Sequence, residues 1–162
     1  MTQVNDPVLS HLLASSREVL EAMVGRSVTF SLPIEGEALR PRSNVVGTSA
    51  FTGSIGGGLV AFYTTLETAK VLTATMLGIR ETPVDDEVID AIGEITNMIA
   101  GTLRTKMAAD GDLWAVSIPT VTVGSDFYTK CVRDVRRVLC PLKIDEHELF
   151  IELIVASQSK AA

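Results

Sequence analysis

DDEVIDAIGEITNMIAGTLRTK, from Asp85 to Lys106, repeats its aliphatic residues every three or four positions. A helix advances by about 100° per residue, so this spacing places the aliphatic side chains on one face. We expect a helix that begins at Asp85 or Asp86 and ends near Lys106. Its buried face should contain Val88, Ile92, Ile95, Ile99 and Leu103.

The opposite face of this helix forms a polar ridge. Its members are separated by steps of four, three, four and three residues: Asp90, Glu94, Asn97, Gly101 and Arg104. Side chains three positions apart are neighbours on a helix surface, so Glu94 and Asn97 should lie together, one turn apart.

Glycine and asparagine are unusual choices on this ridge. Gly93 and Gly101 each cost about 1 kcal/mol relative to alanine in a helix, and Asn97 is a poor helix former. Missing side chains flatten the surface and allow another molecule to approach. The plain alternative is a solvated face with ordinary acids, because Glu-x-x-Asn is a short motif with many chance matches.

The pattern of this helix recurs near the N-terminus. We expect a first helix from Pro7 to Val24, capped by Asn5 or Asp6 and ended by Gly25. Its residues Glu18, Glu21 and Gly25 have the same spacing as Glu94, Asn97 and Gly101. Each helix is followed by a strand ending in serine, an aliphatic residue and proline, at Ser31 to Pro33 and at Ser117 to Pro119. Chance similarity between two amphipathic helices is the alternative explanation.

The remaining segments read mainly as strands. We expect them at 28–34, 44–55, 59–65, 115–123, 132–144 and 148–156, with a hairpin turn at Gly56 to Gly58 and a short helix from Leu66 to Leu77. The expected fold class is α/β (α+β), with two pseudo-symmetric helix-plus-three-strand halves. Their long helices should pack on a mostly antiparallel sheet of about six strands, in a single domain spanning residues 1–162.

Charge and composition exclude several classes of function. The net charge is −6, from 20 acidic and 14 basic residues, so we expect no nucleic acid and no membrane as partners. The basic residues Arg133, Arg136 and Arg137 read as a charged strand edge or dimer rim.

Met1 to Pro7 does not resemble a signal peptide, and no apolar run is long enough to span a bilayer. We therefore expect a cytoplasmic protein. His11 and His147 are isolated, and no metal site is expected.

The segment Asp90 to Gly101 resembles the signature helix of the CheC/CheX/FliY phosphatases of bacterial chemotaxis. Asp90, Glu94 and Asn97 match the family pattern in type and spacing, and Pro119 follows at about the expected distance. The first helix has Glu21 where the pattern needs asparagine. One intact motif is the CheX arrangement, and the resemblance implies a homodimer with one site per subunit.

The resemblance also implies an activity, namely hydrolysis of the aspartyl phosphate of a CheY-like response regulator. Asn97 would position the attacking water, and Glu94 would dock against the active-site lysine of the receiver domain. Asp90, Gly93, Gly101 and Pro119 would support docking. No cofactor is expected on this chain, and Mg²⁺ is expected on the receiver-domain partner.

A second function remains open beside the enzyme. Related modules without an intact motif bind partners and hydrolyse nothing, so the chain could be a non-catalytic CheC-like binding or scaffold module. Such a module would recognise a receiver domain or a flagellar switch partner. The intact pair of Glu94 and Asn97 favours the phosphatase.

Overall fold

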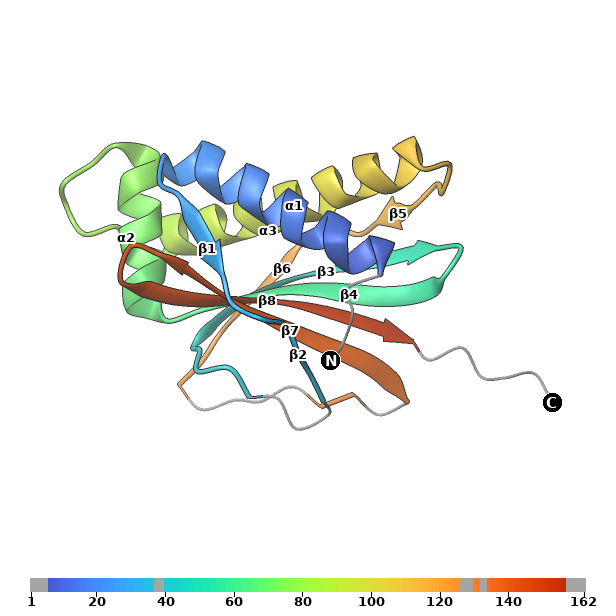
Figure 1. Cartoon of the computed structure of the whole chain (residues 1–162). Helices are drawn as coiled ribbons and strands as arrows, with labels where there is room; N and C mark the ends of the chain where they lie inside the picture. The colour runs from blue at the N-terminus through green and yellow to red at the C-terminus, as the bar shows by residue number, and fades with distance from the viewer. Residues whose placement is uncertain (1–5, 37–39, 126–129, 132–133, 157–162) are drawn as a thin grey trace.

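The computed structural model describes residues 6–36, 40–125, 130–131 and 134–156. Within these residues, the helices at 7–24 and 85–109 cover one face of an eight-stranded sheet, and the helix at 66–77 stands at one end of it (Figure 1). The elements are α1 (Pro7–Val24), β1 (Val28–Phe30), β2 (Ile34–Glu35), β3 (Val45–Gly53), β4 (Gly56–Thr64), α2 (Leu66–Leu77), α3 (Asp85–Ala109), β5 (Ala115–Val116), β6 (Thr120–Val123), β7 (Val135–Ile144) and β8 (His147–Ala156).

The helices agree closely with the expected ranges because their end signals are local. Asp6 caps α1 by accepting hydrogen bonds from the Val8 and Leu9 amides, and Gly25 ends it in the left-handed conformation. Gly78 ends α2 in the same way. The helix α3 continues beyond the expected end, to Ala109.

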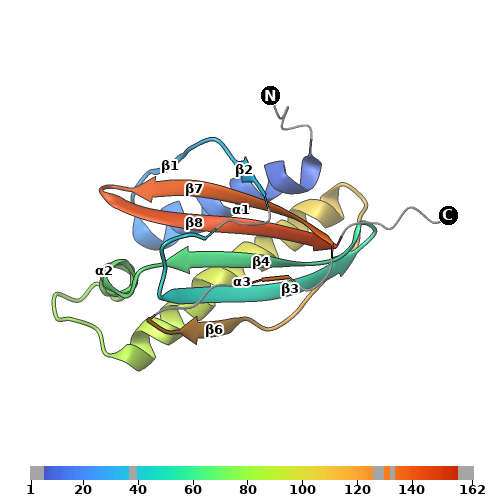
Figure 2. The same ribbon diagram turned by 90° about the horizontal axis from the view of Figure 1, so that it is seen from below.

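The described strands are joined in the order β1–β7–β8–β4–β3–β5, and every pairing among them is antiparallel (Figure 2). In addition, β2 pairs with β7 and β6 pairs with β3. All six expected strand segments are present, and the described sheet has eight strands because two of these segments are each split in two. Pro33 and Pro119 lie at the two breaks, where proline cannot donate to a strand ladder.

The two split strands support the pseudo-symmetry that the repeat predicted. The amide of Ser31 donates to the carbonyl of Pro141 at 2.9 Å, and the amide of Ser117 donates to that of Ala50 at 2.8 Å. Strands β1 and β2 thus join the β7–β8 hairpin, whereas β5 and β6 join the β3–β4 hairpin. In each half, the split strand that follows the long helix pairs with the hairpin of the other half.

Two details of the repeat and the hairpin differ from expectation. Gly25 ends α1, whereas Gly101 lies inside α3, so the two glycines are not structural equivalents. The β3–β4 turn lies at Ser54 and Ile55, not at Gly56 to Gly58. Gly58 lies in β4, where it pairs with Phe51 and Val155. Only glycine fits there, because a Cβ would lie 2.2 Å from the Ile154 carbonyl oxygen and 2.4 Å from the Phe51 ring.

The main core lies between the helices and the sheet. From α3, the side chains of Ile92, Ile95 and Ile99 are fully buried there, as expected from their spacing. Burying an aliphatic side chain of this size contributes about 2 kcal/mol. This buried face holds α3 against the sheet and leaves its polar ridge facing outward.

The sheet face away from the helices carries a buried ion pair. The Arg137 guanidinium donates to the Glu152 carboxylate at 2.6 Å, and the Tyr63 hydroxyl donates to the same carboxylate at 2.5 Å. Both charged side chains are almost completely buried. The interpretation of Arg137 as part of a charged edge was therefore wrong, while Arg133 lies outside the described residues.

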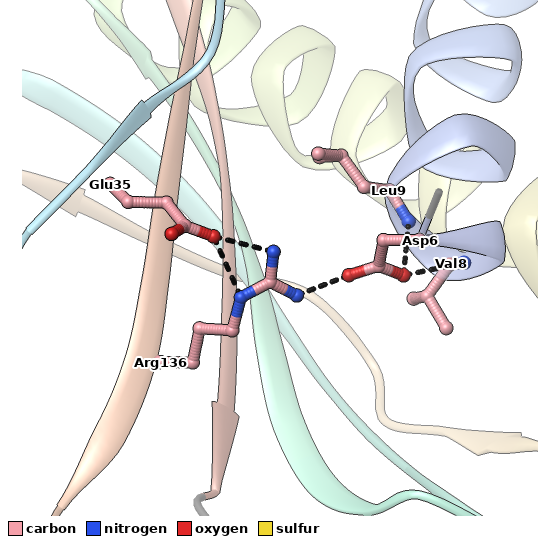
Figure 3. Close-up of polar contacts among 5 residues, drawn as sticks. All are labelled: Asp6, Val8, Leu9, Glu35 and Arg136. Carbon is pink, nitrogen blue, oxygen red and sulfur yellow. Dashed lines mark hydrogen bonds and ion pairs between the residues drawn. The ribbon is translucent and has the colours of Figure 1, made fainter. Parts of the chain in front are cut away.

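Arg136 ties the start of α1 to the edge of the sheet (Figure 3). The Nε of its guanidinium donates to the Glu35 carboxylate at 2.8 Å. Another guanidinium nitrogen donates to one carboxylate oxygen of the capping residue Asp6. The other Asp6 oxygen caps the helix. One arginine therefore connects β7, β2 and α1.

Candidate functional site

The long helix α3 is stabilised at both ends by its own charges. Its first turn contains Asp85, Asp86 and Glu87, and its last turn contains Lys106. The Glu87 carboxylate also accepts a hydrogen bond of 2.9 Å from the Val84 amide. Acids at the N-terminus and a base at the C-terminus are favourable to the helix dipole. These residues account for the helix ends and leave the middle of the ridge unexplained.

The ridge in the middle of α3 is exposed, as the spacing predicted. Asp90, Glu94, Asn97 and Arg104 are all exposed, and Gly101 is half-buried. Within the described chain, no hydrogen bond or ion pair engages the side chains of Glu94 and Asn97. A carboxylate and a carboxamide one turn apart are therefore available to an external partner.

Gly101 on the ridge and Gly93 at its border are not required by packing inside the described chain. A Cβ on Gly101 would meet nothing within 4 Å. A Cβ on Gly93 would make only an ordinary contact, 3.6 Å from a methyl group of Val121. Alanine would fit at both positions and would favour the helix. The bare backbone there suits the close approach of another molecule.

The strand segment around Pro119 flanks the ridge. Val121 in β6, two residues after Pro119, has the methyl group that a Cβ on Gly93 would contact. The segment is held to β3 through Ser117, whose hydroxyl oxygen accepts from the Ala50 amide at 2.9 Å. Pro119 thus belongs to an anchored edge beside α3. No pattern in the sequence predicts the contact of Val121 with Gly93.

The corresponding acids of α1 are engaged within the chain. Glu21 accepts a hydrogen bond of 3.0 Å from the Val28 amide, and Glu18 pairs with Lys106 at 2.8 Å. Arg17 donates to the Val28 carbonyl at 2.6 Å and lies over the Phe30 ring. The α1 pair therefore holds the helix to β1 and α3, and these acids are not free for a partner.

Two features are missing from the described residues. The described residues contain no group of three or more histidines, cysteines or acids placed to hold a metal ion. None of the described helices has the length and apolar character needed to cross a membrane.

Known proteins with similar sequence and structure point to one family. Residues 45–143 match the family model described as chemotaxis phosphatase CheX. The CheY-P phosphatase CheX of Thermotoga maritima is 28% identical over 123 residues, which cover 76% of this chain and 79% of that protein.

Solved structures agree with this match. The chemotaxis protein CheX from Vibrio vulnificus superposes with a TM-score of 0.77 at 26% identity, covering 90% of this chain and 97% of that one. CheX from Borrelia burgdorferi, solved in complex with CheY, BeF₃ and Mg²⁺, has the same fold, with a TM-score of 0.73, 17% identity and coverage of 91% and 96%. Since the family model matches more than half of the residues, this chain belongs to the CheX family of chemotaxis phosphatases.

Proposed function

We propose that this protein hydrolyses the aspartyl phosphate of a CheY-like receiver domain at the α3 ridge. One observation carries the proposal: Glu94 and Asn97 are exposed and have no partner in the described chain, on a helix whose opposite face is fully packed. Family membership supports it, as does the name of the Thermotoga relative, a CheY-P phosphatase.

Asn97 is suited to hold the attacking water. Its amide oxygen can accept a hydrogen bond from water and its NH₂ group can donate one, while neither carries a charge that repels the phosphoryl oxygens. Phosphoryl transfer depends on positioning and on charge stabilisation more than on a strong base. A water fixed in line with the leaving carboxylate lowers the barrier mainly through the entropy of positioning.

Glu94 is suited to docking rather than to contact with the phosphoryl group. An anionic carboxylate would repel that group, but it pairs well with a lysine ammonium. In the docked complex, the receiver's active-site lysine would lie against Glu94 and the phosphoryl group against Asn97. The Mg²⁺ of the reaction would belong to the receiver, in keeping with the Mg²⁺ in the Borrelia CheX–CheY complex.

The homodimer implied by the family resemblance is part of the proposal. In the described chain β6 pairs on one side only, with β3, and an edge strand with unpaired backbone groups can add a second copy. Sedimentation at several protein concentrations would test this; a monomer at all of them would contradict it.

The activity is tested by phosphate release from phosphorylated receiver domains, with and without the protein. Asn97→Ala should lower the rate by about 100-fold while leaving affinity for a beryllofluoride-loaded receiver intact. Glu94→Ala should weaken that affinity instead. Glu67→Ala, which removes an exposed acid from α2, is the matched control and should change neither.

Two outcomes would contradict the proposal. Unchanged hydrolysis in Asn97→Ala would exclude the water-positioning role. Tight binding of a receiver by the unaltered protein, without any phosphate release, would identify the non-catalytic binding module.

A further inference from the structure

The polar ridge of α3 continues beyond the proposed catalytic pair. Asp90 and Glu94 place negative charge on its N-terminal side, and Arg104 places positive charge on its C-terminal side. Arg104 lies seven positions after Asn97, almost two full turns, so both lie on the same face. The charge of the ridge therefore changes from negative to positive along the helix, and the neutral amide of Asn97 lies between the two.

Arg104 has no ion-pair or hydrogen-bond partner in the described part of the chain. Two other cations of the long helices differ in this respect, since Lys106 pairs with Glu18 and Arg17 binds the Val28 carbonyl. The helix dipole does not explain the position either. Its effect is confined to the last turn, and Arg104 lies more than a turn before the end of α3 at Ala109.

Gly101 provides a second, independent indication at the same place. It lies between Asn97 and Arg104 on the ridge, where a Cβ would meet nothing within 4 Å. Glycine there costs the helix about 1 kcal/mol relative to alanine, and nothing in the described chain requires it. A partner surface lying against the helix backbone at Gly101 would explain the missing side chain, and Arg104 would then be within reach of that partner.

We propose that Arg104 is a specificity residue that orients the receiver domain by pairing with one of its carboxylates. This inference rests on the proposed function and adds a second charged contact to it. Glu94 and Arg104 are ten positions apart, or about 15 Å along the helix axis. The fitting partner has a lysine on one side of its phosphoryl group and an acidic side chain on the other.

Two contacts of opposite sign permit only one orientation. If the receiver docked the other way round, its lysine would face Arg104 and its acid would face Glu94. Like charges brought together in this way are disfavoured and suppress the wrong arrangement. In the allowed orientation the phosphoryl group faces Asn97.

The test measures kcat and KM for a phosphorylated receiver, and affinity for its beryllofluoride-loaded form. Arg104→Ala should raise KM and weaken affinity about threefold, and Arg104→Glu about tenfold, with kcat within twofold of the original. The effect should shrink at high salt. Arg42 is the matched control, because it is an exposed arginine that lines a pocket with Tyr63 and Phe150, away from α3, and Arg42→Glu should change none of these quantities.

Replacing the paired receiver carboxylate by lysine should restore the affinity of Arg104→Glu. Unchanged KM and affinity in Arg104→Glu would overturn this inference while hydrolysis through Asn97 stands. If the unaltered protein neither bound nor hydrolysed any receiver, the inference and the proposed function would both fail.

Discussion

Thr96 of α3 rests directly on Gly47 of β3, so closely that a Cβ on Gly47 would lie 2.0 Å from the Thr96 Oγ1. That Cβ would also lie 3.3 Å from a methyl group of Ile92. The Thr96 hydroxyl is held in place, because it donates to the Ile92 carbonyl at 2.7 Å. Gly47 therefore sets the distance between α3 and the sheet immediately beside Asn97.

Replacing Gly47 with alanine should damage both stability and activity. The added methyl group overpacks the helix–sheet contact, which typically costs about 1–3 kcal/mol. A shift of α3 by a fraction of an ångström would also misplace Asn97 and lower the rate of hydrolysis. Urea unfolding and phosphate release measure the two effects.

Two further variants test whether the clash with Thr96 causes the loss of stability in Gly47→Ala. Thr96→Ala removes the oxygen that the new methyl group meets, so Gly47→Ala/Thr96→Ala should lose less stability than the sum of the single variants. Gly57 lies in the same hairpin, and a Cβ there would have its nearest contact at 3.6 Å. Gly57→Ala should therefore leave the free energy of unfolding almost unchanged. Additive losses in the double variant would exclude the clash.

Glu21 and Asn97 should show opposite behaviour, although both come from the repeated motif. Glu21→Ala removes the acceptor of the Val28 amide and should lower the free energy of unfolding by about 1 kcal/mol. Phosphate release should not change, because the structure uses Glu21 to hold α1 against β1. If Glu21→Ala abolished hydrolysis in a stable protein, α1 would have to contain a working site.

The sequence predicted the helices and their buried faces because these depend on local signals. The period of Val88, Ile92 and Ile95 identifies the core side of α3, and Asp6 and Gly25 mark the ends of α1. The repeat also indicated how the two halves are related. The exposed ridge follows from the same period, so the placement of Glu94 and Asn97 was predictable, whereas their roles remain proposals.

Contacts between distant segments could not be predicted in this way. Arg137 reads as a surface residue, and only the pairing of β7 with β8 places it against Glu152. Gly58 reads as part of a turn because its nearest neighbour in space, the Ile154 carbonyl of β8, lies far away in the sequence. The contact of Gly47 with Thr96 was hidden for the same reason.

Gly101→Ala should make the protein more stable and a poorer phosphatase. Alanine fits without any contact and favours the helix by up to about 1 kcal/mol, so the melting temperature should rise. The methyl group would stand between the helix and a docked receiver, so KM should rise as well. Thr75→Ala places a better helix former at an exposed position of α2. It should raise the melting temperature without changing KM. An unchanged KM in Gly101→Ala would argue against a partner at this position.

Alkaline pH should destabilise the protein through Cys140. Burial raises the pKa of this thiol from 9.0 to about 12, so between these values the unfolded chain loses a proton that the folded chain keeps. The free energy of unfolding therefore falls as pH rises above 9, by at most about 1.4 kcal/mol per pH unit for this group. Burial also raises the pKa of Tyr63 above its usual 10.0, which adds to the loss of stability at higher pH.

Urea unfolding of Cys140→Ala at several pH values should show a shallower decline of the free energy of unfolding. Val138→Ala, a cavity control on the same strand, should be less stable throughout but keep the original slope. Equal slopes for all three proteins would show that Cys140 is not responsible.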